Sequence, residues 1–200
     1  MTRYDSLRLI IAFATHLGLE SDQVDIKSAF LYGDLVEEIW MVPPPGIDLD
    51  GKILRLDKPL YGLKQEPLAW FEKLSEALAR LGFISLAFDP CILISADHKI
   101  IDMVYVDDIT TAGSRSDINR LIDHLRSHFK VTVKGSFKNI LGIEINHTPE
   151  GMELSQRQYI TNILSRVGME SCRPASTPIN QKTCLVKSSD SDPVFQRNLY

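Results

Sequence analysis

Two adjacent carboxylates, Asp107 and Asp108, lie between two stretches rich in apolar and β-branched residues. The composition of residues 100–106 and 109–112 predicts a buried hairpin with both acids at its tip. Neighbouring ionised carboxylates repel each other and lose hydration beside an apolar strand, so water or a cation must neutralise them. Hard oxygen ligands suit Mg²⁺. An ordinary solvated turn explains this tetrapeptide equally well, because Asp is common in turns.

A third acid, Asp25, lies near the end of a strand predicted over residues 22–26. Strand ends are usual places for metal-binding or catalytic carboxylates in mixed α/β folds. Alternatively, the Asp25 side chain only caps the turn predicted at residues 28–31. This stretch alone leaves both interpretations open.

A loop from Tyr61 to Gln65 joins tyrosine, glycine and lysine just before a helix predicted over residues 67–81. Pro67 suits the first helical turn, and Gly82 follows as a stop. Such a loop lets backbone N–H groups approach a phosphate or a base pair, with Lys64 adding positive charge. A plain connecting loop is the structural alternative.

The remaining periodicity predicts an α+β chain. Asp89-Pro90 indicates a turn, Ser116 is the expected cap of the third helix, and Ser155 with Gln158 forms a capping box for the fourth. The helices are expected over residues 5–17, 118–129 and 155–167, with strands over residues 38–42, 52–56 and 91–94, a hairpin formed by residues 137–146 and 152–154, and a linker over residues 174–193.

Composition limits the class of protein. A hydrophobic content of 44% can build a core, while a net charge of −4 argues against a generally basic nucleic-acid-coating protein. One acid-free stretch nevertheless carries a basic residue at every fourth position, which is either a solvated helix face running into a loop or a phosphate contact. These residues are Arg126, Lys130, Lys134 and Lys138.

Three widely spaced cysteines without a C-x-x-C pair indicate neither a disulfide framework nor a zinc module, and they fit a reducing compartment best. His124 and His128 could share a helix face, but no cysteine or third histidine lies nearby, so surface histidines are the favoured interpretation. No signal peptide is predicted from these residues, and no apolar run is long enough to span a bilayer.

Several motifs, in matching order and spacing from about Tyr4 to Pro178, closely resemble the reverse transcriptase of copia-type long-terminal-repeat retrotransposons. Such an ordered series is far more specific than any single motif. The matching stretches are residues 24–33 (VDIKSAFLYG), 37–41 (EEIWM), 60–65 (LYGLKQ), 105–108 (YVDD), 141–145 (LGIEI), 154–156 (LSQ) and 159–160 (YI).

This resemblance implies a right-hand polymerase palm, an antiparallel sheet with helices packed on one face, followed by the start of a thumb and with the fingers largely missing. Residues 1–178 would form this fragment, with the palm over about 1–135 and the primer-grip hairpin and thumb start over 136–178. Residues 179–200 would be a linker and the truncated start of a further helix.

The resemblance also implies site roles. Asp25 and Asp107 would bridge two Mg²⁺ ions, with Asp108 as the third acid and Mn²⁺ as an alternative metal. Phe30 would lie beneath the nucleotide sugar and exclude a 2′ hydroxyl, although an aromatic residue is more often simply core. Nucleotide and template contacts would come from Tyr61, Gly62, Lys64, Gln65 and Tyr105, and the primer grip from Leu141 and Gly142.

One stretch departs from the family pattern. The usual Asp-Leu-Gly is replaced around Val133-Lys134-Gly135, so the choice between Lys134 and Lys138 as the acid that protonates pyrophosphate stays open.

By this resemblance the expected activity is RNA-directed DNA polymerisation with an RNA template, a DNA primer and deoxynucleoside triphosphates. The expected setting is a retrotransposon polyprotein with ribonuclease H and integrase, in a cytoplasmic virus-like particle or the nucleus and without a membrane. A catalytically dead relic or a non-catalytic nucleic-acid-binding remnant is the alternative. A generic two-metal phosphotransferase would not explain the loop at residues 61–65.

Overall fold

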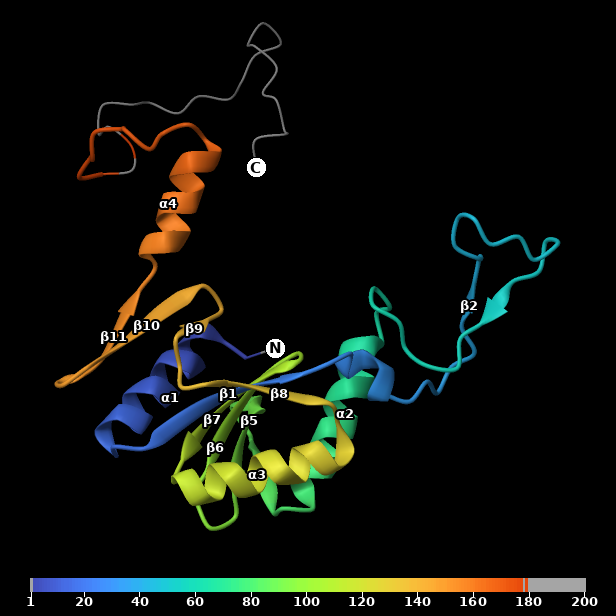
Figure 1. The fold of residues 1–200 in the computed structure, drawn as a ribbon, viewed down its shortest axis with the longest axis horizontal. Coiled ribbons are helices and arrows are strands. Elements are labelled where there is room, and N and C mark those ends of the chain that lie inside the picture. Colours follow the sequence, from blue (N-terminus) through green and yellow to red (C-terminus); the bar gives the residue numbers. More distant parts are fainter. Residues whose placement is uncertain (1, 178, 180–200) are drawn as a thin grey trace, which may run out of the picture. The chain divides into compact units, whose positions relative to one another are not determined.

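The computed structural model describes residues 2–177 and 179 (Figure 1). Contacts divide the chain into two compact units. The first unit comprises Met1–Lys138 and Ile145–Glu153, and the second contains Asn139–Glu144 and the chain from Leu154 onward. All the predicted acidic site residues lie in the first unit.

The first unit is built on a six-stranded sheet whose neighbouring strands are all antiparallel. Its spatial order is β4-β5-β6-β7-β1-β8, so the predicted hairpin β6-β7 lies at its centre, beside β1. The α+β prediction is confirmed at this level. The strands are β1 (Glu20–Ile26), β4 (Phe83–Leu86), β5 (Asp89–Ser95), β6 (Ile101–Tyr105), β7 (Asp108–Gly113) and β8 (Val131–Gly135).

Helices cover both faces of this sheet, which corrects the prediction of helices on one face only. The helices α2 (Glu66–Ala79) and α3 (Arg115–His128) share one buried cluster with Val24, Val104 and Ile109 of the strands. The buried residues of α1 (Tyr4–His16) are not part of that cluster, and Figure 1 shows α1 on the opposite side of the sheet. The reason is strand alternation, because the other strand face, with Met103 and Ile92, is also buried and needs a cover.

The shorter elements come either between β1 and α2 or after β8 in the sequence. The strands predicted over residues 38–42 and 52–56 shrink to two residues each, and they pair only with each other. The turn predicted after β1 is a short 3₁₀-helix. These elements are η1 (Ala29–Tyr32), β2 (Trp40–Met41), β3 (Leu54–Arg55), β9 (Asn139–Ile140), β10 (Ile143–Thr148), β11 (Gly151–Ser155) and α4 (Arg157–Arg166).

Several local predictions are wrong by a few residues. Asp89-Pro90 begins β5 instead of forming a turn, and the partner strand β4 was not predicted. Ser114, not Ser116, caps α3, since its side chain accepts the N–H of Asp117.

The predicted capping box of the fourth helix does not form. Gln156 is the N-cap of α4 and makes no side-chain cap bond. Instead, the Gln158 N–H binds the Glu144 carboxylate at 2.8 Å, and Ser155 accepts the N–H of Arg157. A glutamate distant in sequence therefore replaces the local partner.

The linker predicted to run to residue 193 and the helix start predicted over residues 195–200 lie outside the described residues, apart from the first few residues of the linker. Among the helices that the structure describes, none has the length and apolar character needed to cross a membrane.

Asp102 is an ionisable residue in the middle of the buried sheet. It lies on β6, is 0% exposed and faces Thr111 across the hairpin. Neither carboxylate oxygen has a hydrogen-bond partner. Burial raises the pKa of Asp102 to about 7, since a charged carboxylate loses its hydration there.

We expect Asp102→Asn to stabilise the protein at pH 8 by at least about 1 kcal/mol. The folded state keeps a proton on Asp102 that the unfolded chain releases, so wild-type stability should fall as pH rises from about 4 to about 7. Denaturant unfolding across this range measures the effect. The exposed Asp57→Asn serves as the control, and an equal pH dependence in wild type and Asp102→Asn would contradict the assignment.

Candidate active site

The β6-β7 hairpin carries the two adjacent acids on a two-residue turn. Tyr105 pairs with Asp108 across the strands, which leaves Val106 and Asp107 as the turn residues. Val106 has φ 57°, a left-handed value that is rare for a β-branched residue and costs on the order of 1 kcal/mol or more. The surrounding structure must therefore hold this turn.

Strand β1 supplies the third acid in register with the turn. Asp25 lies directly opposite Asp108, and the next residue, Ile26, donates its N–H to the Asp107 carbonyl at 2.9 Å. Val24 and Ile109 form the buried pair that precedes the acids. The structure thus brings together the strand ends on which all three predicted acids lie.

Lys134 is the counter-ion of two of these acids. Its Nζ lies 2.9 Å from Asp25 Oδ1 and 2.7 Å from Asp108 Oδ1. Partial burial opposes the charge of Lys134, but the bonds to both carboxylates outweigh it and raise the pKa of this lysine. Lys134 comes from β8, which pairs with β1 on the side opposite to β7.

This ammonium group shows that the carboxylates can hold a cation between them. Two hard oxygen donors from neighbouring strands converge on it, which fits the donor chemistry of Mg²⁺. The Asp107 side chain is not part of this ion pair. Among the described residues, no group of three or more His, Cys, Asp or Glu side chains is arranged to hold a metal.

Phe30 and Tyr61 lie together although they are distant in sequence. Their ring centroids are 5.8 Å apart at an interplanar angle of 55°. Phe30 belongs to η1 directly after β1 and packs partly against the core, whereas Tyr61 is 88% exposed. Both the core interpretation and the sugar-facing interpretation of Phe30 are compatible with this half-buried position.

The loop that begins at Tyr61 is held by its own helix. The buried Glu66 carboxylate accepts the N–H of Leu63 at 3.2 Å. Gly62 has φ 101°, a value that favours glycine, and Gln65 binds the Glu37 carboxylate at 2.6 Å. Lys64 is exposed, so its ammonium is available to an anion.

Leu141 and Gly142 form the tight turn between β9 and β10 in the second unit. Both have left-handed φ values, 52° and 78°, as type I′ hairpin turns require. The structure therefore confirms a hairpin here, while its role as a primer grip stays a prediction.

The predicted basic stripe does not lie on one helix, because α3 ends at His128 and β8 follows. Arg126 pairs with Asp123 at 3.2 Å, while Lys134 pairs with the acids on β1 and β7. Lys138 is exposed and lies after β8. Of the two candidate acid lysines, only Lys134 contacts the carboxylates.

The two histidines contact backbone carbonyl groups through their ring nitrogens. His124 Nε2 binds the Ala77 carbonyl at 2.9 Å, and His128 Nδ1 lies 3.0 Å from the His124 carbonyl oxygen. Both of these ring nitrogens thus lie at backbone carbonyl oxygens.

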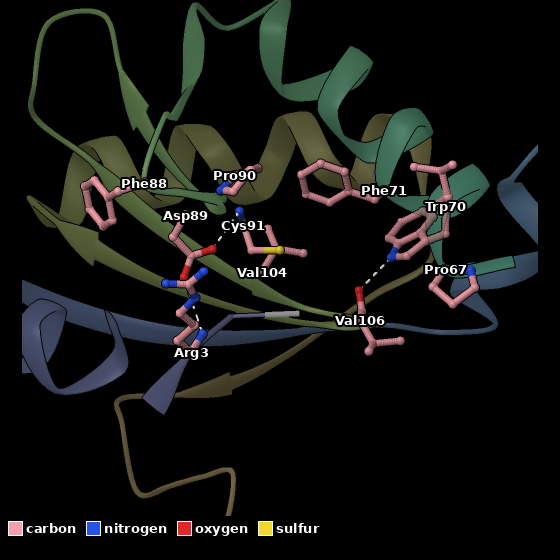
Figure 2. Close-up of a pocket in the computed structure, with 11 residues that line it drawn as sticks. Arg3, Pro67, Trp70, Phe71, Phe88, Asp89, Pro90, Cys91, Val104 and Val106 are labelled. Atoms are coloured by element: carbon pink, nitrogen blue, oxygen red, sulfur yellow. Dashed lines mark hydrogen bonds between the residues drawn. The ribbon is translucent and has the colours of Figure 1, made fainter. Parts of the chain in front are cut away.

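The sequence did not reveal a contact between Trp70 and the acidic turn. Trp70 Nε1 donates to the Val106 carbonyl at 2.6 Å, as Figure 2 shows. Trp70 lies within the helix predicted over residues 67–81, and helical periodicity alone indicates no such contact. A buried tryptophan needs an acceptor for its N–H, and that requirement is the one signal the sequence contained.

Comparison with known proteins decides the family. Residues 1–181 match the family described as reverse transcriptase (RNA-dependent DNA polymerase). The chain belongs to this reverse transcriptase family. The predicted resemblance to copia-type long-terminal-repeat retrotransposons is confirmed, because the similar proteins are transposon polyproteins.

Relatives of this reverse transcriptase chain occur in plants and yeast. A retrovirus-related Pol polyprotein from transposon TNT 1-94 of Nicotiana tabacum is 36% identical over 188 residues, 90% of this chain and 14% of the relative. That of transposon RE1 from Arabidopsis thaliana is 36% identical over 180 residues, covering 87% and 12%. The Ty1-MR1 Gag-Pol polyprotein of Saccharomyces cerevisiae is 31% identical over 174 residues, covering 79% and 10%.

The chain thus spans about one seventh of the tobacco relative. Reverse transcriptases generally use divalent metal ions. In this chain the position between Asp25 and Asp108 is filled by the Lys134 ammonium.

Lys134→Met should tighten the affinity of the chain for Mg²⁺ or Mn²⁺ at least about threefold, because it removes the ammonium that competes for Asp25 and Asp108. The loss of folding stability should stay within about 1 kcal/mol, since these groups are partly exposed. Isothermal titration with Mn²⁺ measures the affinity. Lys138→Met is the control, and equal affinities for wild type and Lys134→Met would disprove the competition.

Proposed function

We propose that this chain contributes the catalytic sheet of an RNA-directed DNA polymerase, which adds deoxynucleotides to a primer on an RNA template. The observation that carries the proposal is the register of β1 with β7, which brings Asp25 opposite Asp108 and bonds Ile26 to the Asp107 carbonyl. Membership of the reverse transcriptase family supports it. Residues 1–135 would form the palm, and residues 136–178 the primer-grip hairpin and the start of the thumb.

In this proposal Asp25 and Asp107 hold a pair of divalent ions, with Asp108 as the neighbouring acid. When bound, such ions activate the primer 3′ hydroxyl and neutralise charge on the leaving pyrophosphate. The chain's own contribution is to position the carboxylates at the ends of adjacent strands. A bound ion would take the place of the Lys134 ammonium, which pairs with Asp25 and Asp108.

The nucleotide would lie beside η1 and the loop that follows β3. The contact between Phe30 and Tyr61 supports this placement, since it joins the two segments that the family resemblance assigns to the nucleotide. Lys64 is exposed at the same loop and supplies a positive charge for phosphate. In the second unit, Leu141 and Gly142 would contact the primer through their tight turn.

Asp107→Asn should abolish Mg²⁺-dependent extension of a DNA primer on an RNA template, with a loss of at least about a hundredfold. The amide keeps the size of the side chain but removes the charge that holds a metal. Extension is measured by gel with the chain alone and with a longer version that adds the flanking segments of the tobacco relative. Asp57→Asn is the surface control. If neither wild-type version extends a primer with Mg²⁺ or Mn²⁺, the non-catalytic alternative replaces this proposal.

Phe30→Ala should raise the incorporation of ribonucleotides relative to deoxynucleotides at least about tenfold. A smaller side chain at η1 leaves space for the 2′ hydroxyl that the ring excludes. The ratio of kcat/KM for the two nucleotide classes measures the effect. Phe13→Ala, at an exposed ring of α1 outside the candidate site, is the aromatic control. Unchanged discrimination in Phe30→Ala with unchanged folding would make Phe30 a core residue only.

A further inference from the structure

A buried hydrogen bond connects helix α2 to the acidic turn. Trp70 is 1% exposed, and its Nε1 donates to the Val106 carbonyl oxygen at 2.6 Å. Figure 2 shows the indole directed at this oxygen, beside a cavity of about 400 Å³ that Pro67 and Phe71 also line. This hydrogen bond is the directional contact between α2 and the acidic turn.

The accepting oxygen lies in the peptide group directly before Asp107, so the hydrogen bond affects the backbone of that residue. The Val106 carbonyl belongs to the peptide group that joins Val106 to Asp107, so holding it fixes ψ of Val106 and φ of Asp107. The peptide group on the other side of Asp107 is held as well, since its oxygen accepts the N–H of Ile26. Both peptide planes that orient the Asp107 side chain therefore have a partner outside the turn.

The turn needs this support. Val106 adopts φ 57°, a conformation that a β-branched residue keeps only where its surroundings impose it. Within the hairpin, Tyr105 and Asp108 form the last strand pair, and the turn residues lie beyond it. Trp70 supplies the constraint from outside the hairpin.

Trp70 is itself held in place by aromatic neighbours. Phe129 lies edge-on at 5.2 Å between ring centroids, and Tyr32 lies at 6.2 Å. The Tyr32 hydroxyl accepts the N–H of Lys130 at 2.9 Å, which joins η1 to the start of β8. A Cβ on Gly33 would come within 3.1 Å of Ala69, so η1 and α2 touch at their backbones.

From this geometry we propose that Trp70 is a positioning residue, which orients Asp107 through the Val106 carbonyl without touching substrate. The catalytic consequence rests on the proposed function, because it requires Asp107 to act in the reaction. Trp70 can orient the turn whether or not Asp107 is catalytic. The structural effect and the catalytic effect can therefore be tested separately.

The chain offers a matched control, because its second tryptophan, Trp40, is 52% exposed on β2. In Trp40→Phe the remaining indole N–H signal in an NMR spectrum belongs to Trp70, and we expect it to exchange slowly with solvent. Trp70→Phe removes the donor. Replacing Trp70 by 3-benzothienylalanine in the Trp40→Phe background removes the donor and keeps the ring size.

Two readouts decide the proposal. The amide signals of Asp107 and Asp108 should broaden or split in Trp70→Phe and in the sulfur isostere, and stay unchanged in Trp40→Phe. In primer extension, kcat should fall about tenfold or more, with nucleotide KM within twofold and an unchanged melting temperature for the isostere. A lower kcat with unchanged KM and melting temperature is expected when a catalytic group is misplaced. A less well packed core would lower the melting temperature as well.

The proposal is overturned if the isostere leaves both the turn signals and kcat at the level of Trp40→Phe. Should Trp70→Phe fail to fold, the isostere carries the test by itself. If the wild-type chain extends no primer, the proposed function fails, and the amide signals of the turn alone decide whether Trp70 positions Asp107.

Discussion

The antiparallel register of β1 with β7 is the constraint on which the candidate site depends. Side chains alternate between the two faces of a strand, so a slip of one residue would turn Asp25 toward the helices α2 and α3. The buried pair of Val24 and Ile109 prevents that slip, because it would then have to face the opposite side. Hydrophobic burial therefore places the acids, although it contributes nothing to their chemistry.

Electrostatics then shape the surroundings of the acids. On the face that carries Asp25 and Asp108, Lys134 from a third strand neutralises two carboxylates that would otherwise repel each other. On the opposite face of the same hairpin, burial raises the pKa of Asp102 to about 7, which favours its neutral form. The hairpin thus carries a paired, ionised carboxylate at Asp108 and a buried carboxyl group at Asp102. Only the ionised one offers a charge to a metal ion.

Backbone contacts tie the turn to distant segments. Asp107 is flanked by one peptide group bonded to β1 and another bonded to α2, while the aromatic ring of Phe129 connects α2 to the end of α3. Strain at Val106 is tolerable because these partners come from rigid elements. A small displacement of α2 would therefore change the orientation of Asp107, even though no residue of α2 lies in the acidic cluster.

The sequence by itself determined the central hairpin, the four helices to within a few residues and the family, because periodicity, turn residues and ordered motifs are local properties. Only the tertiary structure decided where Lys134 points, which face α1 covers, and that Glu144 caps α4 through Gln158. It also decided that Trp70 bonds the acidic turn. These contacts join segments far apart in the chain, and they depend on strand pairing and helix packing, for which a single sequence carries no local signal.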